Sequence, residues 1–132
     1  MLRPLRVDQL FRCLTWACVV VLALLSLTPR DLIVRTGAPG LAEHFVAYLG
    51  TGMIAGLGYG RRVSYINIAV LLIAYAGLLE IGQLWISRRH SAFVDFAISS
   101  AGVAFGVLVP LVGRALARSR RYGLTSGRHR LR

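Results

Sequence analysis

Apolar residues gather in four long runs along this chain. The runs span approximately residues 10–27, 43–60, 63–86 and 92–113. A helix of about 20 apolar residues crosses the roughly 30 Å hydrocarbon core of a bilayer. The pattern therefore predicts an all-α membrane protein, a four-transmembrane-helix bundle within residues 1–113, with little chain left for another domain.

The composition supports the membrane class. Of 132 residues, 56% are hydrophobic and 16% are charged, whereas soluble domains are about 45–50% apolar and about a quarter charged. All 16 basic residues are arginine, which excludes lysine chemistry, and they flank the apolar runs as membrane topology requires. We therefore expect no nucleic-acid partner, and we interpret Cys13 and Cys18 in the first run as packing residues.

Arginine placement predicts the orientation. Twelve arginines lie before or at the start of the first run, between the second and third runs and after the fourth, against four in the other two connections. Because cytoplasmic loops carry the excess of positive charge, both termini are predicted to be cytoplasmic. The first run lacks an Ala-x-Ala cleavage pattern and is interpreted as an uncleaved helix. The Arg-rich tail, 114–132, is predicted to be disordered or to lie on anionic lipid.

Acidic residues and histidine are few inside the runs, and all lie near the extracytoplasmic ends. Glu43 and His44 open the second run, Glu80 and Gln83 lie near the end of the third, and Asp95 lies near the start of the fourth. Charges at membrane depth are costly and usually face the bundle interior or water. These side chains are therefore predicted to share one polar layer.

Helical spacing places each of these residues above a face of small residues. The predicted faces are His44, Tyr48, Gly52, Gly56 and Gly60 in the second run, Ala69, Ile73, Ala76, Glu80, Gln83 and Ser87 in the third, and Asp95, Ser99, Gly102 and Gly106 in the fourth. Small residues at four-residue spacing let transmembrane helices approach closely. The three faces, and their polar ends, should therefore meet.

Glu80 needs a partner or a neutral form, because it lies inside an apolar stretch. His44, Arg88 and Arg89 are the candidate partners. A functional carboxylate and a structural interhelical ion pair both fit this position. His44 and Glu43 also fit a simpler interpretation as interfacial residues in headgroup water.

The motifs Glu43-His44-Phe45-x-x-Tyr48, Glu80-x-x-Gln83 and Arg89 six residues before Asp95, followed by Gly102 and Gly106, resemble the VanZ-like family of small bacterial membrane proteins. The resemblance covers roughly residues 40–109 and implies a multi-pass protein of the bacterial cell membrane, from a family associated with teicoplanin resistance. Many members carry Asp-Lys upstream of the histidine and Asn after the aspartate, where this chain has Gly40-Leu41 and Ser99. The matching positions, with Arg88 beside them, are the candidate ligand-binding residues: His44, Tyr48, Glu80, Gln83, Arg88, Arg89 and Asp95.

Three classes of function, besides a purely structural role, are compatible with these residues. The favoured one is a non-enzymatic envelope protein that binds an amphiphilic antibiotic or a lipid-linked cell-wall precursor at the outer leaflet, with Arg88 and Arg89 holding an anionic head. The others are a proton-coupled transporter that titrates Glu80 and an intramembrane hydrolase or transferase with His44 as base. We predict no cofactor and no metal, and no pattern separates contacts within one chain from those of a homo-oligomer.

Overall fold

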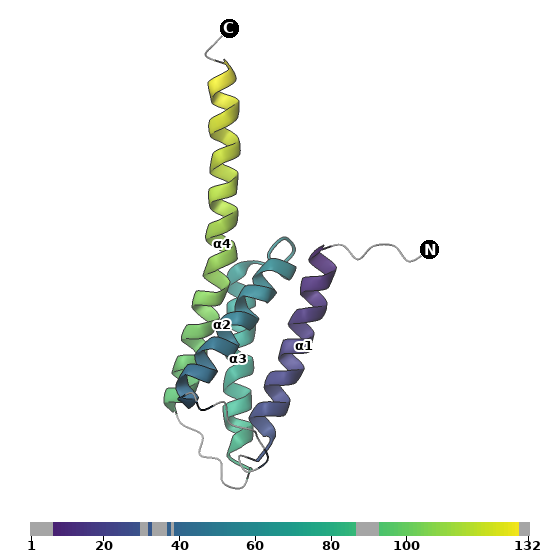
Figure 1. The fold of residues 1–132 in the computed structure, drawn as a ribbon, viewed down its shortest axis with the longest axis vertical. Coiled ribbons are helices and arrows are strands. Elements are labelled where there is room, and N and C mark those ends of the chain that lie inside the picture. Colours follow the sequence, from purple (N-terminus) through teal and green to yellow (C-terminus); the bar gives the residue numbers. More distant parts are fainter. Residues whose placement is uncertain (1–6, 30–31, 33–36, 38, 87–92, 130–132) are drawn as a thin grey trace, which may run out of the picture.

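Four helices form the fold in the computed structural model, which describes residues 7–29, 32, 37, 39–86 and 93–129. The helices are α1 (Val7–Leu27), α2 (Gly40–Tyr59), α3 (Tyr65–Gln83) and α4 (Phe93–His129). Consecutive helices run in opposite directions (Figure 1). The all-α four-helix prediction is confirmed, and apart from the end of α4 the bounds lie within three residues of those predicted.

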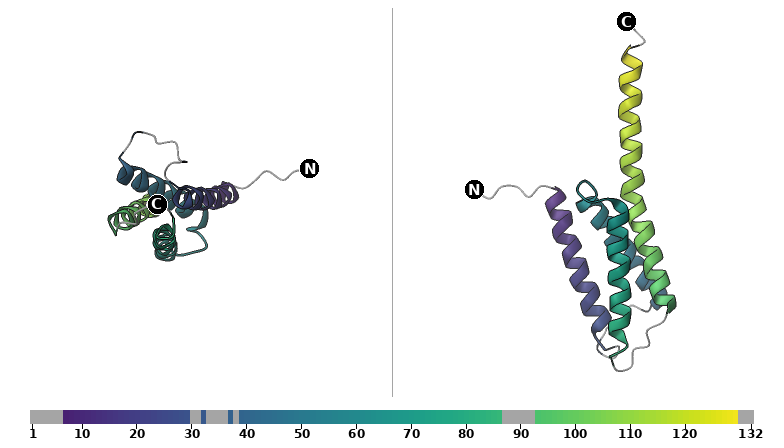
Figure 2. Two further views of the ribbon diagram at one scale, coloured as in Figure 1. Left: turned by 90° about the horizontal axis from the view of Figure 1, so that it is seen from below. Right: turned by 180° about the vertical axis from the view of Figure 1, so that it is seen from behind.

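Three of these helices, α1, α3 and α4, are long and apolar enough to cross a membrane. Helix α2 has a similar length, 20 residues, but it contains several glycines and carries Glu43 and His44 near its start. It contacts α1 on one side and α4 on the other (Figure 2). Because much of its surface is covered by neighbouring helices, α2 needs fewer large apolar side chains than a lipid-facing helix.

The closest helix contact joins α2 and α4 through glycines. A Cβ atom added at Gly102 would lie 2.6 Å from the Phe45 carbonyl oxygen, and one at Gly52 would lie 2.9 Å from the Val103 carbonyl oxygen. Gly106 lies equally tightly against the backbone of Leu49. The predicted small-residue faces of the second and fourth runs therefore meet, and their backbones touch.

Helix α1 lies at the edge of the bundle. Its buried residues are Thr15, Leu22 and Ser26. Trp16 is exposed, but its indole Nε1 donates a 2.9 Å hydrogen bond to the hydroxyl of Tyr59 on α2. The large apolar side chains that α1 leaves exposed suit contact with lipid.

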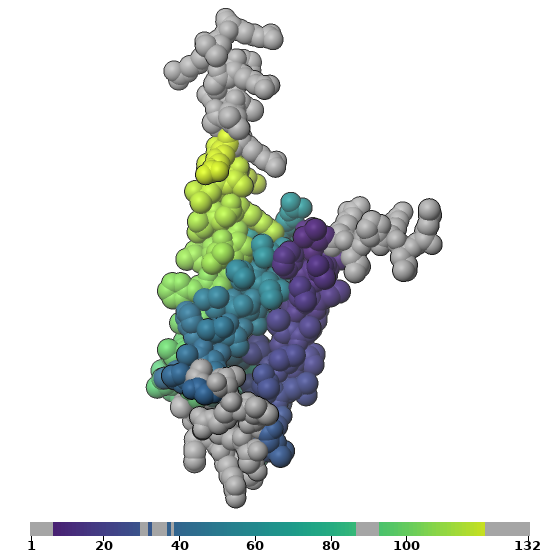
Figure 3. Space-filling model, in the orientation of Figure 1, coloured from purple at the N-terminus to yellow at the C-terminus, as the bar shows by residue number. Residues whose placement is uncertain are grey.

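Helix α4 does not stop where the sequence predicts. It continues past residue 113 to His129 and projects beyond the other three helices (Figures 1 and 3). Residues 114–129 of the tail, which the sequence predicts to be disordered or to lie on anionic lipid, are helical in this structure. Pro110, inside α4, does not end the helix, and the arginine, alanine and leucine residues that follow are good helix formers.

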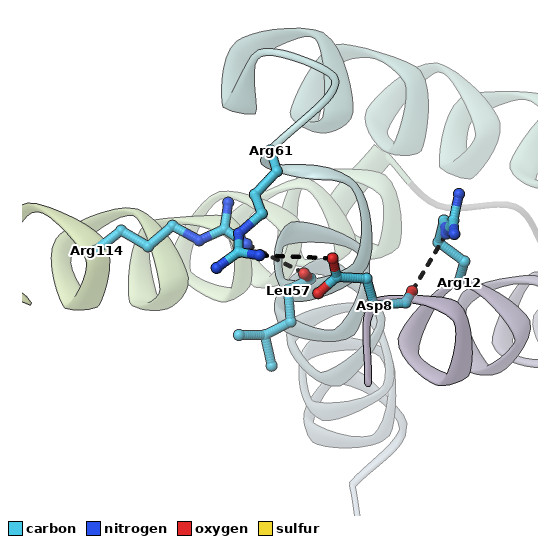
Figure 4. A network of polar contacts seen from close by, with 5 residues as sticks. All are labelled: Asp8, Arg12, Leu57, Arg61 and Arg114. Carbon is cyan, nitrogen blue, oxygen red and sulfur yellow. Dashed lines mark hydrogen bonds and ion pairs between the residues drawn. The ribbon is translucent and has the colours of Figure 1, made fainter. Parts of the chain in front are cut away.

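A polar network joins α1, α2 and α4 at the end where α1 begins (Figure 4). Arg61 lies 3.7 Å from the carboxylate of Asp8, and Arg12 donates to the Asp8 carbonyl oxygen at 3.2 Å. Arg114 donates to the carbonyl oxygen of Leu57 at 3.1 Å. These arginines lie at one end of the bundle, as the charge pattern predicts.

Candidate functional site

His44, Glu80 and Asp95 converge at the opposite end of the bundle from this network. One ligand atom from each side chain, an imidazole nitrogen or a carboxylate oxygen, lies within 4.8 Å of the corresponding atoms of the other two. The three residues come from α2, α3 and α4. The predicted convergence is confirmed, while the binding role of these residues stays a prediction.

The positions of the three residues within their helices explain the meeting. His44 lies one turn into α2, Asp95 lies in the first turn of α4, and Glu80 lies one turn before the end of α3. The antiparallel order brings the starts of α2 and α4 beside the end of α3 (Figure 1). The close contacts between α2 and α4 at Gly52, Gly102 and Gly106 then hold these two helices near enough for His44 and Asp95 to share one site.

Burial differs across this cluster, which we call the triad (His44, Glu80 and Asp95). The Glu80 side chain is buried, with 7% of the residue exposed, whereas His44 and Asp95 are half-buried. Glu43, next to His44, is exposed. The interfacial interpretation therefore suits Glu43, while His44 belongs to the triad.

Two buried residues with hydroxyl groups, Tyr48 and Ser99, lie near members of the triad. The Ser99 hydroxyl lies 3.4 Å from Nδ1 of His44, and the hydroxyl of Tyr48 is close enough to interact electrostatically with Glu80. Both residues are almost completely buried. Tyr48 is one of the predicted site residues, but the contact of Ser99 with His44 was not expected. Its spacing of four residues from Asp95 was the signal available in the sequence.

Gln83 is buried one turn after Glu80 on the same face of α3. Its amide Nε2 has no hydrogen-bond partner among the residues that the structure describes. Burying a donor without an acceptor costs about 1–3 kcal/mol. The amide is therefore a donor that an additional polar group in this region would satisfy.

The two predicted arginines, Arg88 and Arg89, lie outside the described residues. The structure therefore describes five of the seven candidate residues. Three of these form the triad, Tyr48 lies beside it, and Gln83 lies one helical turn from Glu80.

An apolar groove of about 370 Å³ lies between α1, α2 and α3. Its lining includes Trp16, Tyr59, Leu72 and Tyr75. The groove therefore lies beside the Trp16–Tyr59 hydrogen bond, and no residue of the triad is part of its lining.

The site combines two carboxylates and an imidazole with the hydroxyl groups of Tyr48 and Ser99 in a mostly apolar bundle. Carboxylates accept hydrogen bonds from the donors of a polar molecule, and imidazole either donates or accepts. Carboxylates and imidazole are also ligands of divalent metals. Comparison with family models, curated proteins and solved structures finds no match for this chain.

Proposed function

We propose that this chain is a VanZ-like protein of the bacterial cell membrane that binds the polar head of an amphiphile at the outer leaflet. The observation that carries this proposal is the meeting of His44, Glu80 and Asp95 at one end of an apolar helical bundle. Polar residues at such positions usually mark a functional site, because burying them is costly.

The apolar groove supports an amphiphile as the ligand. A site for such a molecule needs polar groups for the head and an apolar surface for the acyl or prenyl chain. The triad supplies the first, and the groove, whose lining includes Tyr75 five residues before Glu80 on α3, supplies the second. Candidate ligands are a lipid-linked cell-wall precursor or a lipoglycopeptide antibiotic of the teicoplanin kind, whose anionic groups Arg88 and Arg89 would hold.

The proposal requires all four helices to span the membrane with both termini in the cytoplasm. The arginine network at one end of the bundle and the triad at the other support this orientation. A reporter that is active only outside the cytoplasm should give no signal when fused after Arg132. The same reporter inserted in the 28–39 connection should be active, and the reverse pattern would contradict the orientation.

Mass spectrometry of molecules that co-purify with the protein in mild detergent tests the binding proposal. We expect one amphiphile class to be enriched with the parent protein. The Glu80→Gln variant should lose most of it, because the amide keeps the shape of the side chain but removes the negative charge that accepts donors strongly. Glu43→Gln, which changes an exposed carboxylate at the same end, is the matched control.

Other outcomes of this experiment separate the alternatives. Equal retention by the parent and Glu80→Gln would contradict binding at the triad. Proton-driven uptake into vesicles that stops completely in Glu80→Gln would support the transporter instead. Normal retention combined with a lower yield of Glu80→Gln would support a structural ion pair.

A further inference from the structure

We propose that His44, Glu80 and Asp95 bind one divalent metal ion of the Zn²⁺ type. This inference uses residues of the proposed amphiphile site but does not require an amphiphile. It also departs from the sequence-based expectation of no metal, since the sequence alone does not reveal how closely the three ligand atoms approach.

The donor set suits such a metal. Zn²⁺ is bound by histidine nitrogen and by aspartate or glutamate oxygen, and sites with three protein ligands leave a position for water or substrate. Bonds of about 2.0–2.1 Å in a tetrahedral site place ligand atoms roughly 3.3 Å apart. The three atoms already lie within 4.8 Å of one another, so they need to approach one another by no more than roughly 1.5 Å to reach that spacing.

The surroundings of the triad resemble those of a metal site. A metal-bound histidine usually makes a hydrogen bond through its other ring nitrogen, and that bond orients the ring. The Ser99 hydroxyl lies 3.4 Å from Nδ1 of His44, so in this arrangement Nε2 would be the nitrogen that binds the metal. Ser99 is 1% exposed and is held on the α4 face that packs against α2.

Gln83 provides a second, independent observation. It is 2% exposed, lies on the same helical face as Glu80, and its Nε2 has no partner among the described residues. A water or anionic ligand on the open position of a metal would add a hydrogen-bond acceptor to this region. Such an acceptor would recover the cost of burying the amide.

Charge also favours a divalent cation. Glu80 and Asp95 come from different helices, yet their carboxylates meet at a site where one of them is buried. Two nearby carboxylates repel each other, especially where the dielectric constant is low. A divalent ion bound between the two ionised carboxylates attracts both of them, which offsets their repulsion and links α3 to α4. It would also attract the phosphate of an amphiphile head.

The test is a Zn²⁺ titration of the full-length protein, purified in mild detergent with a tag that contains no histidine and then stripped with a chelator. Competition with a chromophoric chelator should show one Zn²⁺ per chain. His44→Gln, Glu80→Gln and Asp95→Asn should each weaken binding at least tenfold, and Glu43→Gln should bind as the parent does. Co²⁺ should give a visible absorption spectrum that the three triad variants lose.

Two further measurements keep the result unambiguous. Circular dichroism checks that each variant is folded, and Asp95→Glu, which keeps the ligand type, should retain binding within about tenfold. The inference is overturned if the folded parent binds no Zn²⁺, or if the triad variants bind as tightly as Glu43→Gln. Amphiphile retention measured with and without the chelator distinguishes the two proposals, since either can fail while the other holds.

Discussion

Replacing Gly106 with leucine is expected to push α2 away from α4 and to lower the stability of the fold sharply. The position has no space for even one extra carbon atom, because a Cβ there would overlap the Leu49 carbonyl group and meet the Met53 nitrogen at 3.0 Å. These are backbone atoms, which cannot rotate away. We expect a loss of stability at or above the upper end of the about 1–3 kcal/mol that overpacking usually costs.

Gly113→Leu is the matched control for this substitution. Gly113 lies two turns further along α4, and a Cβ added there meets nothing within 4 Å. Stability is measured by unfolding each purified variant with increasing sodium dodecyl sulfate and following helical circular dichroism. If Gly106→Leu unfolds at the same sodium dodecyl sulfate concentration as the parent and Gly113→Leu, α2 and α4 do not make the close contact described here.

The second large effect is expected at Arg114, which holds the last turn of α2 against α4. The last four carbonyl groups of a helix have no partner within it. In α2, the Gly56 carbonyl accepts from Gly60 and the Tyr59 carbonyl accepts from Arg62 and Val63. The Leu57 carbonyl accepts from Arg114 instead.

Arg114 also contacts the face of an aromatic ring. Its guanidinium carbon lies 5.6 Å from the centre of the Tyr65 ring, at the start of α3. One positive side chain thus links the end of α2, the start of α3 and the middle of α4. A cation near the carboxyl end of a helix is also favoured by the helix dipole.

Arg114→Met removes the charge and the donors but keeps much of the side-chain volume. We expect it to lower the free energy of unfolding by about 1.5–3 kcal/mol, the usual contribution of a hydrogen bond that involves a charged group. Because Nη1 of Arg114 is buried without a partner among the described residues, the lower part of that range is expected. Arg118→Met, at an exposed position one turn later, should change stability little. Equal losses in the two variants would show that the effect is one of net charge.

Apolar periodicity and arginine placement determined much of the fold from the sequence alone. Run length predicts a transmembrane helix, because the bilayer sets the length that an apolar helix needs. The small residues that follow His44 and Asp95 on the same helix faces predict the close approach of two helices. The glycine contacts at Gly52, Gly102 and Gly106 confirm it. The convergence of the triad follows from the same spacing combined with antiparallel order.

The tertiary structure alone decided how these helices are rotated and where their side chains meet. The contact of Ser99 with His44 and the bond of Arg114 to Leu57 each join residues more than 50 positions apart, and both depend on the crossing of α2 and α4. The continuation of α4 to His129 is likewise decided by structure, because composition suggested a disordered tail while helix propensity favours extension. A sequence pattern identifies the face of a helix, but the distance between two faces depends on packing, and the chemistry of the triad depends on that distance.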